Sequence, residues 1–341
     1  MKKQTTIDPT TPHNVVHIIA PARLHLGFID MHGGLGRNFG SLGLCLADIN
    51  THISAVVSDS VFIHGPSSQR ASIYAGRMLE HLGIDSGVEI TIHEAIPEHA
   101  GLGSGTQLSL AVGTAIARIY EYDITAAQLA EIMERGTRSG IGIGAFTLGG
   151  FLVDGGRGKQ TSAPPIICQL PFPEAWRLML IFDTERQGMH GTGEQQAFDS
   201  LQPMSEHMSG RLCRLTLMQA LPALVEANCE MFGATISEIQ MLVGDHFAPL
   251  QGGRYCSQGV AQALARLLDL GATGIGQSSW GPTGFALFAN ETQAYQALRQ
   301  VRDQSLHDPG LSFRVCRARN HKAEVRLEQA DTGKNFKLKN F

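Results

Sequence analysis

The sequence 97-PEHAGLGSGTQ-107 is the strongest indication of the fold, because it joins three alternate glycines to the start of an apolar helix. Residues 87–93 before it resemble a strand, and apolar residues follow it at helical spacing. Glycine lets the backbone take positive φ and approach a ligand closely, and the start of a helix attracts anions. This order of strand, glycine loop and helix predicts a phosphate cradle, with a plain turn as the alternative. We expect phosphate contacts at Gly101, Gly103, Ser104, Gly105, Thr106 and Gln107.

The composition is that of an ordinary globular protein. The length of 341 residues suggests two domains, and 43% hydrophobic with 17% charged residues allows two buried cores. A formal net charge of −4 gives no global positive field, so we expect small-molecule partners, no nucleic acid and no membrane. The six cysteines are scattered without a C-x-x-C pair, which predicts reduced thiols and a cytoplasmic protein.

A proline cluster at 164–173 predicts a domain boundary. Strands are expected before it at 15–20, 41–46 and 52–57. Long helical stretches and a compact α+β ending follow it. We therefore divide the chain into four parts: a flexible leader (1–14), a phosphate-binding domain (15–170), a second domain (171–330) and a flexible tail (331–341).

Polar side chains follow the first expected strand. Arg23, His25 and Asp30 come beyond its predicted end, and alternation along the chain sends Arg23 and His25 to one face. One anion pocket could use both of them. Taken singly, each is more often a surface residue or a buried residue with its hydrogen bonds satisfied.

Two further segments are rich in glycine or hydroxyl groups. The stretch 136–156 indicates turns or close ligand approach and includes the cation Arg138, with a plain hairpin connection as the alternative. The stretch 276–284 lies between two expected strands and could cap a site with Ser278 and Ser279. By itself that stretch predicts only a turn.

Together these segments resemble the GHMP superfamily, which is named for galacto-, homoserine, mevalonate and phosphomevalonate kinases. The matching stretches are 23–43, 97–107 and 276–284. Within the superfamily the chain more closely resembles the beta-ribofuranosylaminobenzene 5'-phosphate synthase family, through APARLHLGF (20–28), GLGSGTQ (101–107) and RSGIG (138–142), which leads to GGFLVDGG (149–156). The resemblance implies an α+β fold of GHMP type. Its N-terminal α/β domain would carry the phosphate loop, and its C-terminal α+β domain would be ferredoxin-like.

The chain departs from the kinase pattern at two places. GHMP kinases commonly read Gly-Leu-Gly-Ser-Ser-Ala in the phosphate loop, whereas Gly105 and Thr106 follow Ser104 here. Many of those kinases also place an aspartate shortly after Ser-Gly, but Ile141 follows Gly140 in this chain. Phosphoryl transfer depends mainly on positioning and charge, so the missing base disfavours a kinase without excluding one. A non-catalytic ligand sensor is the other alternative.

The synthase resemblance implies a specific reaction. Members of the family join 4-aminobenzoate, or 4-hydroxybenzoate, to 5-phosphoribosyl 1-diphosphate and release carbon dioxide and diphosphate on the way to a tetrahydromethanopterin-type carrier. Such chemistry needs no protein nucleophile. It needs aligned reactants, cations for the diphosphate and the exclusion of water.

The resemblance also implies roles for particular residues and a homodimer. Mg²⁺ would bind mainly through the diphosphate, with Asp30 and Asp154 as candidate ligands, although either could instead cap a turn. The candidate catalytic residues are Arg23, His25, Arg138 and His190, and the further substrate contacts are Ser139, Gly140, Ser278 and Ser279.

Overall fold

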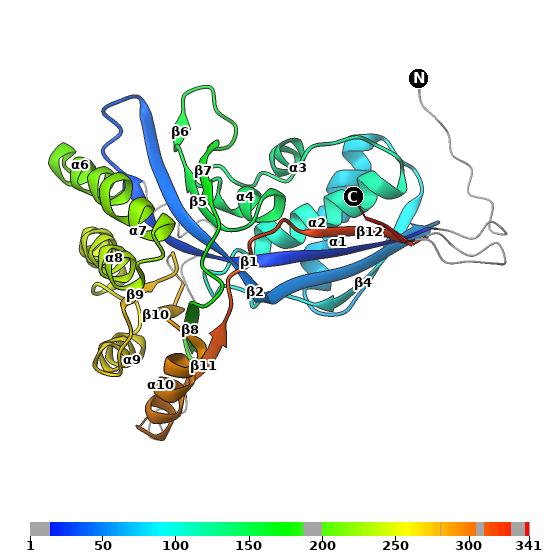
Figure 1. The fold of residues 1–341 in the computed structure, drawn as a ribbon. Helices are drawn as coiled ribbons and strands as arrows, with labels where there is room; N and C mark the ends of the chain where they lie inside the picture. Colours follow the sequence, from blue (N-terminus) through cyan, green and yellow to red (C-terminus); the bar gives the residue numbers. More distant parts are fainter. Residues whose placement is uncertain (1–13, 187–199, 280, 305–309, 329–337, 341) are drawn as a thin grey trace.

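The computed structural model describes residues 14–186, 200–279, 281–304, 310–328 and 338–340 (Figure 1). A nine-stranded sheet has the main order β13-β12-β1-β2-β4-β3, and β5, β6 and β7 extend it beside β2. Its strands are β1 (Val15–Asp30), β2 (Arg37–Ser58), β3 (Phe62–His64), β4 (Gly87–Glu94), β5 (Phe151–Asp154), β6 (Arg157–Gly158), β7 (Ile166–Leu170), β12 (Glu324–Glu328) and β13 (Leu338–Asn340). The helices of this unit are α1 (Ser68–Leu82), α2 (Ser104–Ile119), α3 (Ala126–Ile132) and α4 (Ile141–Thr147).

The two longest strands, β1 and β2, differ from the sequence expectation. Two strands were expected over 41–57, but β2 continues through because the polar Asp48 has a partner: its carboxylate accepts from the backbone N–H and the guanidinium of Arg317. Arg23 and His25 do not follow the end of a strand, since β1 continues to Asp30. The register of the pairing between β1 and β2 shifts at Pro21/Arg23 and at His25/Gly27. Strand β1 therefore continues through Arg23 and His25 with irregular pairing.

Helices α1 and α2 cover one face of the large sheet (Figure 1). Their apolar residues, including Met78 and Leu110, pack against Ile18, Ile53 and Ile90 of the strands. The predicted order of strand, glycine loop and helix is confirmed, because β4 precedes the loop and α2 begins at Ser104. The phosphate loop therefore stands at a fixed helix start, supported by a buried core.

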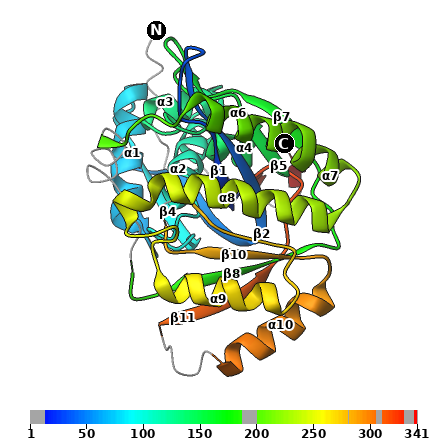
Figure 2. The ribbon, with the colours of Figure 1, turned by 90° about the vertical axis from the view of Figure 1, so that its left-hand side faces the viewer.

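The second unit is ferredoxin-like. Its antiparallel sheet has the order β11-β8-β10-β9, and helices α9 and α10 complete the β-α-β-β-α-β sequence. Residues alternate along β8: Met179 and Ile181 pack with α9 and α10, whereas Leu178 and Leu180 face the core shared with α8. Figure 2 shows α8 on one face of this sheet and α9 and α10 on the other. The elements of this unit are β8 (Arg177–Asp183), α6 (Glu206–Leu215), the π-helical turn η1 (Thr216–Ala220), α7 (Leu221–Val225), α8 (Cys229–Gln251), α9 (Gln258–Asp269), β9 (Gly274–Gln277), β10 (Gly284–Phe288), α10 (Glu291–Gln304) and β11 (Leu311–Cys316).

The end of the chain returns to the first unit. Strand β12, within the expected second domain 171–330, pairs with β1, and β13, within the expected tail, pairs with β12. The α+β fold of GHMP type is thus present, but the two sheets do not divide the chain at a single point.

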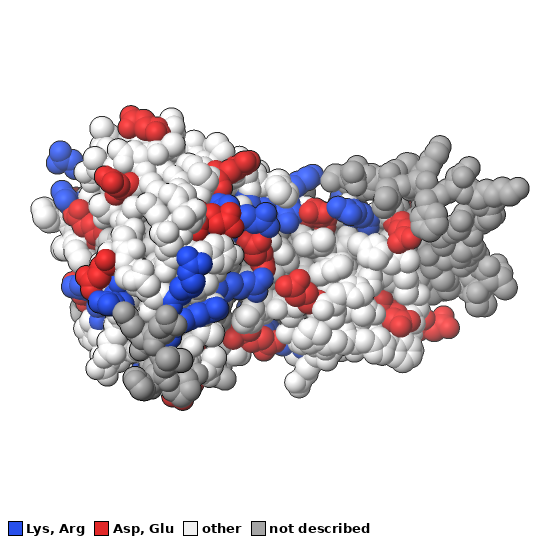
Figure 3. Space-filling model, turned by 60° about the horizontal axis from the view of Figure 1, so that its bottom comes forward, with Lys and Arg blue, Asp and Glu red and all other residues white. Residues whose placement is uncertain are grey.

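Neither one broad charged area on the face in Figure 3 nor a candidate membrane span is found among the described residues. On the face in Figure 3, Lys and Arg lie beside Asp and Glu without a wide region of one sign. Among the helices that the structure describes, none is long and apolar enough to cross a bilayer.

A cluster of aromatic rings joins the two units. Phe232 of α8 has its ring centroid 5.6 Å from that of Phe151 on β5, 5.8 Å from Phe172 and 5.5 Å from Trp176. Since Phe151 belongs to the large sheet and Phe232 to the second unit, this cluster packs the two units against each other in one core. Aromatic pairs in this geometry add to the free energy of apolar burial.

We expect Phe232→Ala to lower the free energy of unfolding by about 3–5 kcal/mol, because it removes a ring at the centre of this core. The control is Met231→Ala on the same helix, whose side chain is 46% exposed; its cost should stay within about 0.5 kcal/mol. Urea denaturation measures both variants. Equal stabilities would show that the ring cluster does not hold the units together.

Candidate active site

Arg23 of β1 holds the phosphate loop from one side. Its backbone N–H donates to the carbonyl oxygen of Leu102 at 3.1 Å, and its Nη1 donates to the carbonyl oxygen of Gly101. Gly101 and Gly103 have φ values of 75° and 82°, in the left-handed region that favours glycine. A Cβ atom on Gly103 would lie 3.2 Å from Cγ of Arg23, so the loop and the arginine side chain are in close contact. The glycine cradle thus lies beside a fixed cation.

The third motif, residues 276–284, contacts the same loop from the second unit. The hydroxyl of Ser278 donates to the carbonyl oxygen of Gly101 at 2.8 Å and accepts the backbone N–H of His25 at 3.0 Å. The N–H of Ser279 donates to the carbonyl oxygen of His25 at 3.3 Å. Trp280, the next residue, lies outside the described residues. The three motifs that suggested a common site are therefore in direct contact.

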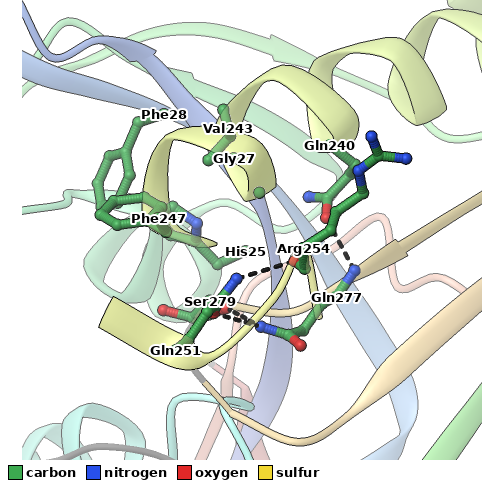
Figure 4. Close-up of a pocket in the computed structure, with 11 residues that line it drawn as sticks. His25, Gly27, Phe28, Gln240, Val243, Phe247, Gln251, Arg254, Gln277 and Ser279 are labelled. Atoms are coloured by element: carbon green, nitrogen blue, oxygen red, sulfur yellow. Dashed lines mark hydrogen bonds between the residues drawn. The ribbon is translucent and has the colours of Figure 1, made fainter. Parts of the chain in front are cut away.

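His25 is a buried, neutral imidazole. Its side chain points into the protein from β1, and the residue is 3% exposed (Figure 4). Burial, together with the positive charges of Arg23 and Arg138, lowers the pKa of His25 to about 3. No described residue forms a hydrogen bond with its Nε2. His25 therefore offers a polar nitrogen without adding a third positive charge.

A pocket of about 30 Å³ lies beside His25, where β1 meets α8 (Figure 4). The ring of Phe28 contacts His25 edge-on, with centroids 4.6 Å apart, and lies 6.2 Å from the ring of Phe247. Gln240 of α8 accepts the backbone N–H of Gln277 at 2.8 Å. The sequence analysis did not single out the α8 residues that line this pocket, because an apolar stripe on a helix is typical of any core.

Asp154 belongs to the loop architecture rather than to a metal site. Its carboxylate accepts from Ser139 Oγ at 3.0 Å and from the backbone N–H groups of Gly140 at 2.9 Å and Gly156 at 3.0 Å. Burial raises the pKa of Asp154 above the ordinary value, and these hydrogen bonds oppose that shift. Since Asp154 is fully buried and both its oxygens accept hydrogen bonds, it does not fit the role of an Mg²⁺ ligand. It does bring a carboxylate to Ser139 and Gly140, the place where the sequence lacked one.

The remaining predicted residues have varied surroundings. Gln107 is buried, and its Nε2 donates to the carbonyl oxygen of Gly142 at 2.7 Å, so it fixes the start of α4. A Cβ atom on Gly142 would lie 2.9 Å from Cγ2 of Thr106, which places Thr106 at the same junction. Asp30 accepts from two backbone N–H groups in the turn that follows it, those of residues 32 and 33. His190 lies outside the described residues.

Mg²⁺ finds no ready set of protein ligands in the described parts of the chain. They contain no group of three or more His, Cys, Asp or Glu side chains placed to hold a metal ion. Of the two carboxylates that were expected as ligands, Asp154 accepts hydrogen bonds at both oxygens, whereas Asp30 accepts them at Oδ1. The role of Asp30 as a ligand stays a prediction.

Two arginines that the sequence analysis missed lie at the start of α2. A Cβ atom on Gly105 would be 3.0 Å from Nη2 of Arg70 and 3.6 Å from Nη1 of Arg135. Arg70 is on α1, and Arg135 follows α3. Neither belongs to a motif, and only the packing of α1 and α3 against α2 brings them to the loop. The loop thus has cations near both Gly103 and Gly105.

The fold and the glycine loop define a GHMP-type protein. Two family models match the chain: GHMP kinases N terminal domain over residues 70–150 and GHMP kinases C terminal over residues 220–306. Among solved structures, L. major mevalonate kinase in complex with R-mevalonate has a TM-score of 0.69 at 15% identity and covers 92% of this chain and 99% of its own. Homoserine kinase from Cytophaga hutchinsonii has a TM-score of 0.63 at 17% identity and covers 94% of this chain and 100% of its own. At these identities the likeness establishes the fold alone.

Curated relatives narrow the class. The beta-ribofuranosylphenol 5'-phosphate synthase of Archaeoglobus fulgidus is 34% identical over 92% of this chain and 100% of its own length. The synthases of the same name from Methanothermobacter thermautotrophicus and Methanocaldococcus jannaschii are 31% and 36% identical over 79% and 66% of this chain, and 88% and 76% of their own lengths. The chain belongs to the beta-ribofuranosylphenol 5'-phosphate synthase family and is an enzyme.

The lowered pKa of His25 predicts a pH dependence of stability. Between about pH 6.5 and 3 the unfolded chain takes up a proton that folded His25 refuses, so the folded state loses stability as the pH falls through this window. From about pH 7.5 to about pH 4.5 this group should account for roughly 2–3 kcal/mol. We expect His25→Gln to lose correspondingly less stability over that range. Urea denaturation at both pH values measures the difference, and equal losses in the two proteins would contradict the assignment.

The loop geometry predicts opposite results for two neighbouring substitutions. Gly103→Val forces a β-branched residue to a φ of 82° against Arg23, and it should weaken binding of inorganic diphosphate by about tenfold or more. Ser104→Ala keeps the backbone N–H groups at the helix start, and its affinity should stay within about threefold of the parent. Calorimetry gives both affinities, and circular dichroism confirms folding. A folded Gly103→Val protein with parental affinity would place the anion elsewhere.

Proposed function

We propose that this enzyme forms a C-riboside by decarboxylation. It would join 4-hydroxybenzoate or 4-aminobenzoate to 5-phosphoribosyl 1-diphosphate and release carbon dioxide and diphosphate, in tetrahydromethanopterin biosynthesis. The observation that carries the proposal is the pairing of a glycine cradle with half-buried arginines and a buried, neutral histidine, in a chain of this synthase family. The relatives are named for a ribofuranosylphenol product, which favours the 4-hydroxy substrate.

The proposed reaction separates charge before it forms a bond. The bond between ribose C1 and the diphosphate oxygen breaks, and C1 takes on positive charge while the diphosphate carries the electron pair away. The ring carbon that bears the carboxylate then bonds to C1, helped by electrons from the para substituent. Loss of carbon dioxide returns the electron pair to the ring and restores aromaticity.

The residues of the site suit the leaving group. Arg23 and the N–H groups around Gly103 would stabilise the departing diphosphate, and Arg138 adds positive charge beside them. His25 stays neutral, so it can accept or donate a hydrogen bond to the arene without repelling the positive C1. The apolar rings of Phe28 and Phe247 would exclude water from C1, which water would otherwise hydrolyse. No protein nucleophile is needed.

The proposal includes a magnesium ion. Mg²⁺ supplies positive charge to a diphosphate when it is bound, and it often keeps several water ligands, so in this protein it would enter with the substrate.

We also propose a homodimer, on the resemblance that suggested it. The six cysteines are all free thiols, which agrees with a cytoplasmic enzyme.

The decisive experiment uses carboxyl-labelled 4-hydroxybenzoate and, in parallel, labelled 4-aminobenzoate. With 5-phosphoribosyl 1-diphosphate and magnesium, labelled carbon dioxide and diphosphate should appear one for one, because decarboxylation waits for the C–C bond. Omitting either substrate should stop both products. Diphosphate release without carbon dioxide would contradict the proposed reaction.

A kinase is the second candidate, because GHMP kinases share the fold and a 4-diphosphocytidyl-2-C-methyl-D-erythritol kinase from Trichormus variabilis is 22% identical over 90% of this chain. The site disfavours it, since the carboxylate beside Ser139 is the buried Asp154, whose oxygens already accept hydrogen bonds. Incubation with adenosine triphosphate and homoserine, mevalonate or sugars should yield negligible adenosine diphosphate. Robust turnover of any one would reverse this order.

A further inference from the structure

A second cationic pocket lies beside the phosphate loop at Gly105. It has a volume of about 310 Å³ and is bordered by α1 and by the segment that follows α3. Three arginines line it, Arg70, Arg77 and Arg135, and Glu134 is the acidic residue that lines it with them. The pocket is therefore positive, and it is large enough for a phosphate group with part of a sugar.

Two of these guanidinium groups are held in place by neighbours. Arg70 forms an ion pair with Glu98 at 2.9 Å, and Glu98 also accepts the hydroxyl of Ser67. Arg135 donates to the hydroxyl of Tyr74, and its Cζ lies 5.4 Å from the centroid of that ring. Such fixed, planar guanidinium groups match the geometry of a phosphate group.

The charge of Arg135 is not balanced by a carboxylate. Among the described residues, none of the acidic side chains lies within ion-pair distance of Arg135, and its buried Nε has no hydrogen-bond partner there. Arg77, in contrast, pairs with the exposed Glu134 at 3.0 Å. An anion in this pocket would thus be attracted chiefly by Arg135. Arg70 shares its charge with Glu98, but its remaining N–H groups can still donate hydrogen bonds to the anion.

Gly105 allows this arrangement. A Cβ atom there would lie 3.0 Å from Nη2 of Arg70, closer than side chains normally pack. The common GHMP kinase pattern has serine at this position of the loop, and a Cβ atom there would require Arg70 to shift by a few tenths of an ångström. The departure from the kinase motif therefore leaves room for Arg70 beside the loop.

We propose that this pocket binds the 5-phosphate of the ribosyl substrate, an inference that rests on the proposed function. The substrate has two anionic ends, and the diphosphate must lie near the arene because its departure creates the electrophilic C1. Arg23, near His25 and Gly103, is placed for that end. Arg70 and Arg135, at Gly105, are then placed for the phosphate that the substrate keeps throughout the reaction.

The test compares two probes by calorimetry on the full chain: ribose 5-phosphate, which carries only the retained phosphate, and inorganic diphosphate. Arg135→Ala and Arg70→Ala should each weaken ribose 5-phosphate binding about tenfold or more, and diphosphate binding less than about threefold. Arg23→Ala should show the reverse pattern. The control is Arg211→Ala, an exposed arginine of α6 that pairs with Glu238 and should leave both affinities unchanged.

Each outcome decides the assignment. The assignment would be wrong if Arg135→Ala lost affinity equally for both probes, or lost affinity for diphosphate alone. It would also be wrong if both pocket variants bound ribose 5-phosphate with the affinity of the parent. If the parent makes carbon dioxide and diphosphate one for one but binds no ribose 5-phosphate, the assignment fails while the proposed function stands. If ribose 5-phosphate binding depends on Arg70 and Arg135 but no carbon dioxide forms, the sugar-phosphate site stands and the reaction is a different one.

Discussion

The carbonyl oxygen of Gly101 is the point on which the site depends. It accepts a hydrogen bond from the guanidinium of Arg23 on β1 and another from the hydroxyl of Ser278 in the second unit. The same hydroxyl accepts the N–H of His25, so one serine links the loop, the first strand and the second unit. Gly101 must be glycine here, because a Cβ atom would lie 2.3 Å from the carbonyl oxygen of Ser278. The position of the loop is thereby set by tertiary contacts on both sides.

This arrangement brings Arg23 and Arg138 close to His25. Burial lowers the pKa of His25, and the two arginines act in the same direction, so the imidazole stays neutral beside them. The buried carboxylate of Asp154 uses its oxygens to hold Ser139, Gly140 and the turn at Gly156. On the proposed function, such a site would favour the departure of an anion over the deprotonation of an alcohol.

The fold was predictable because its signals are local. The strand, glycine loop and start of α2 follow directly from residues 87–107, and the phosphate cradle needs only backbone groups. The two errors in the predicted fold, at β2 and at β12, both involve contacts between segments that are distant in the sequence. The sequence predicted two strands, 41–46 and 52–57, where the structure has the single strand β2, because nothing nearby reveals that Arg317, far along the chain, pairs with the carboxylate of Asp48 between them. The pairing of β12 with β1 was also missed, because it joins two segments that lie far apart in the sequence.

Local sequence was enough to predict the glycine loop, the three motif segments and the family, because glycine conformation and helix starts are properties of short stretches. It also named Arg23, His25, Arg138 and Ser278 as site candidates. The surroundings of the side chains came from the folded protein: His25 is buried and neutral, Asp154 holds a turn, and Arg70 and Arg135 reach the loop. Burial and charge at a side chain depend on which distant segments pack around it, and no local pattern encodes that packing.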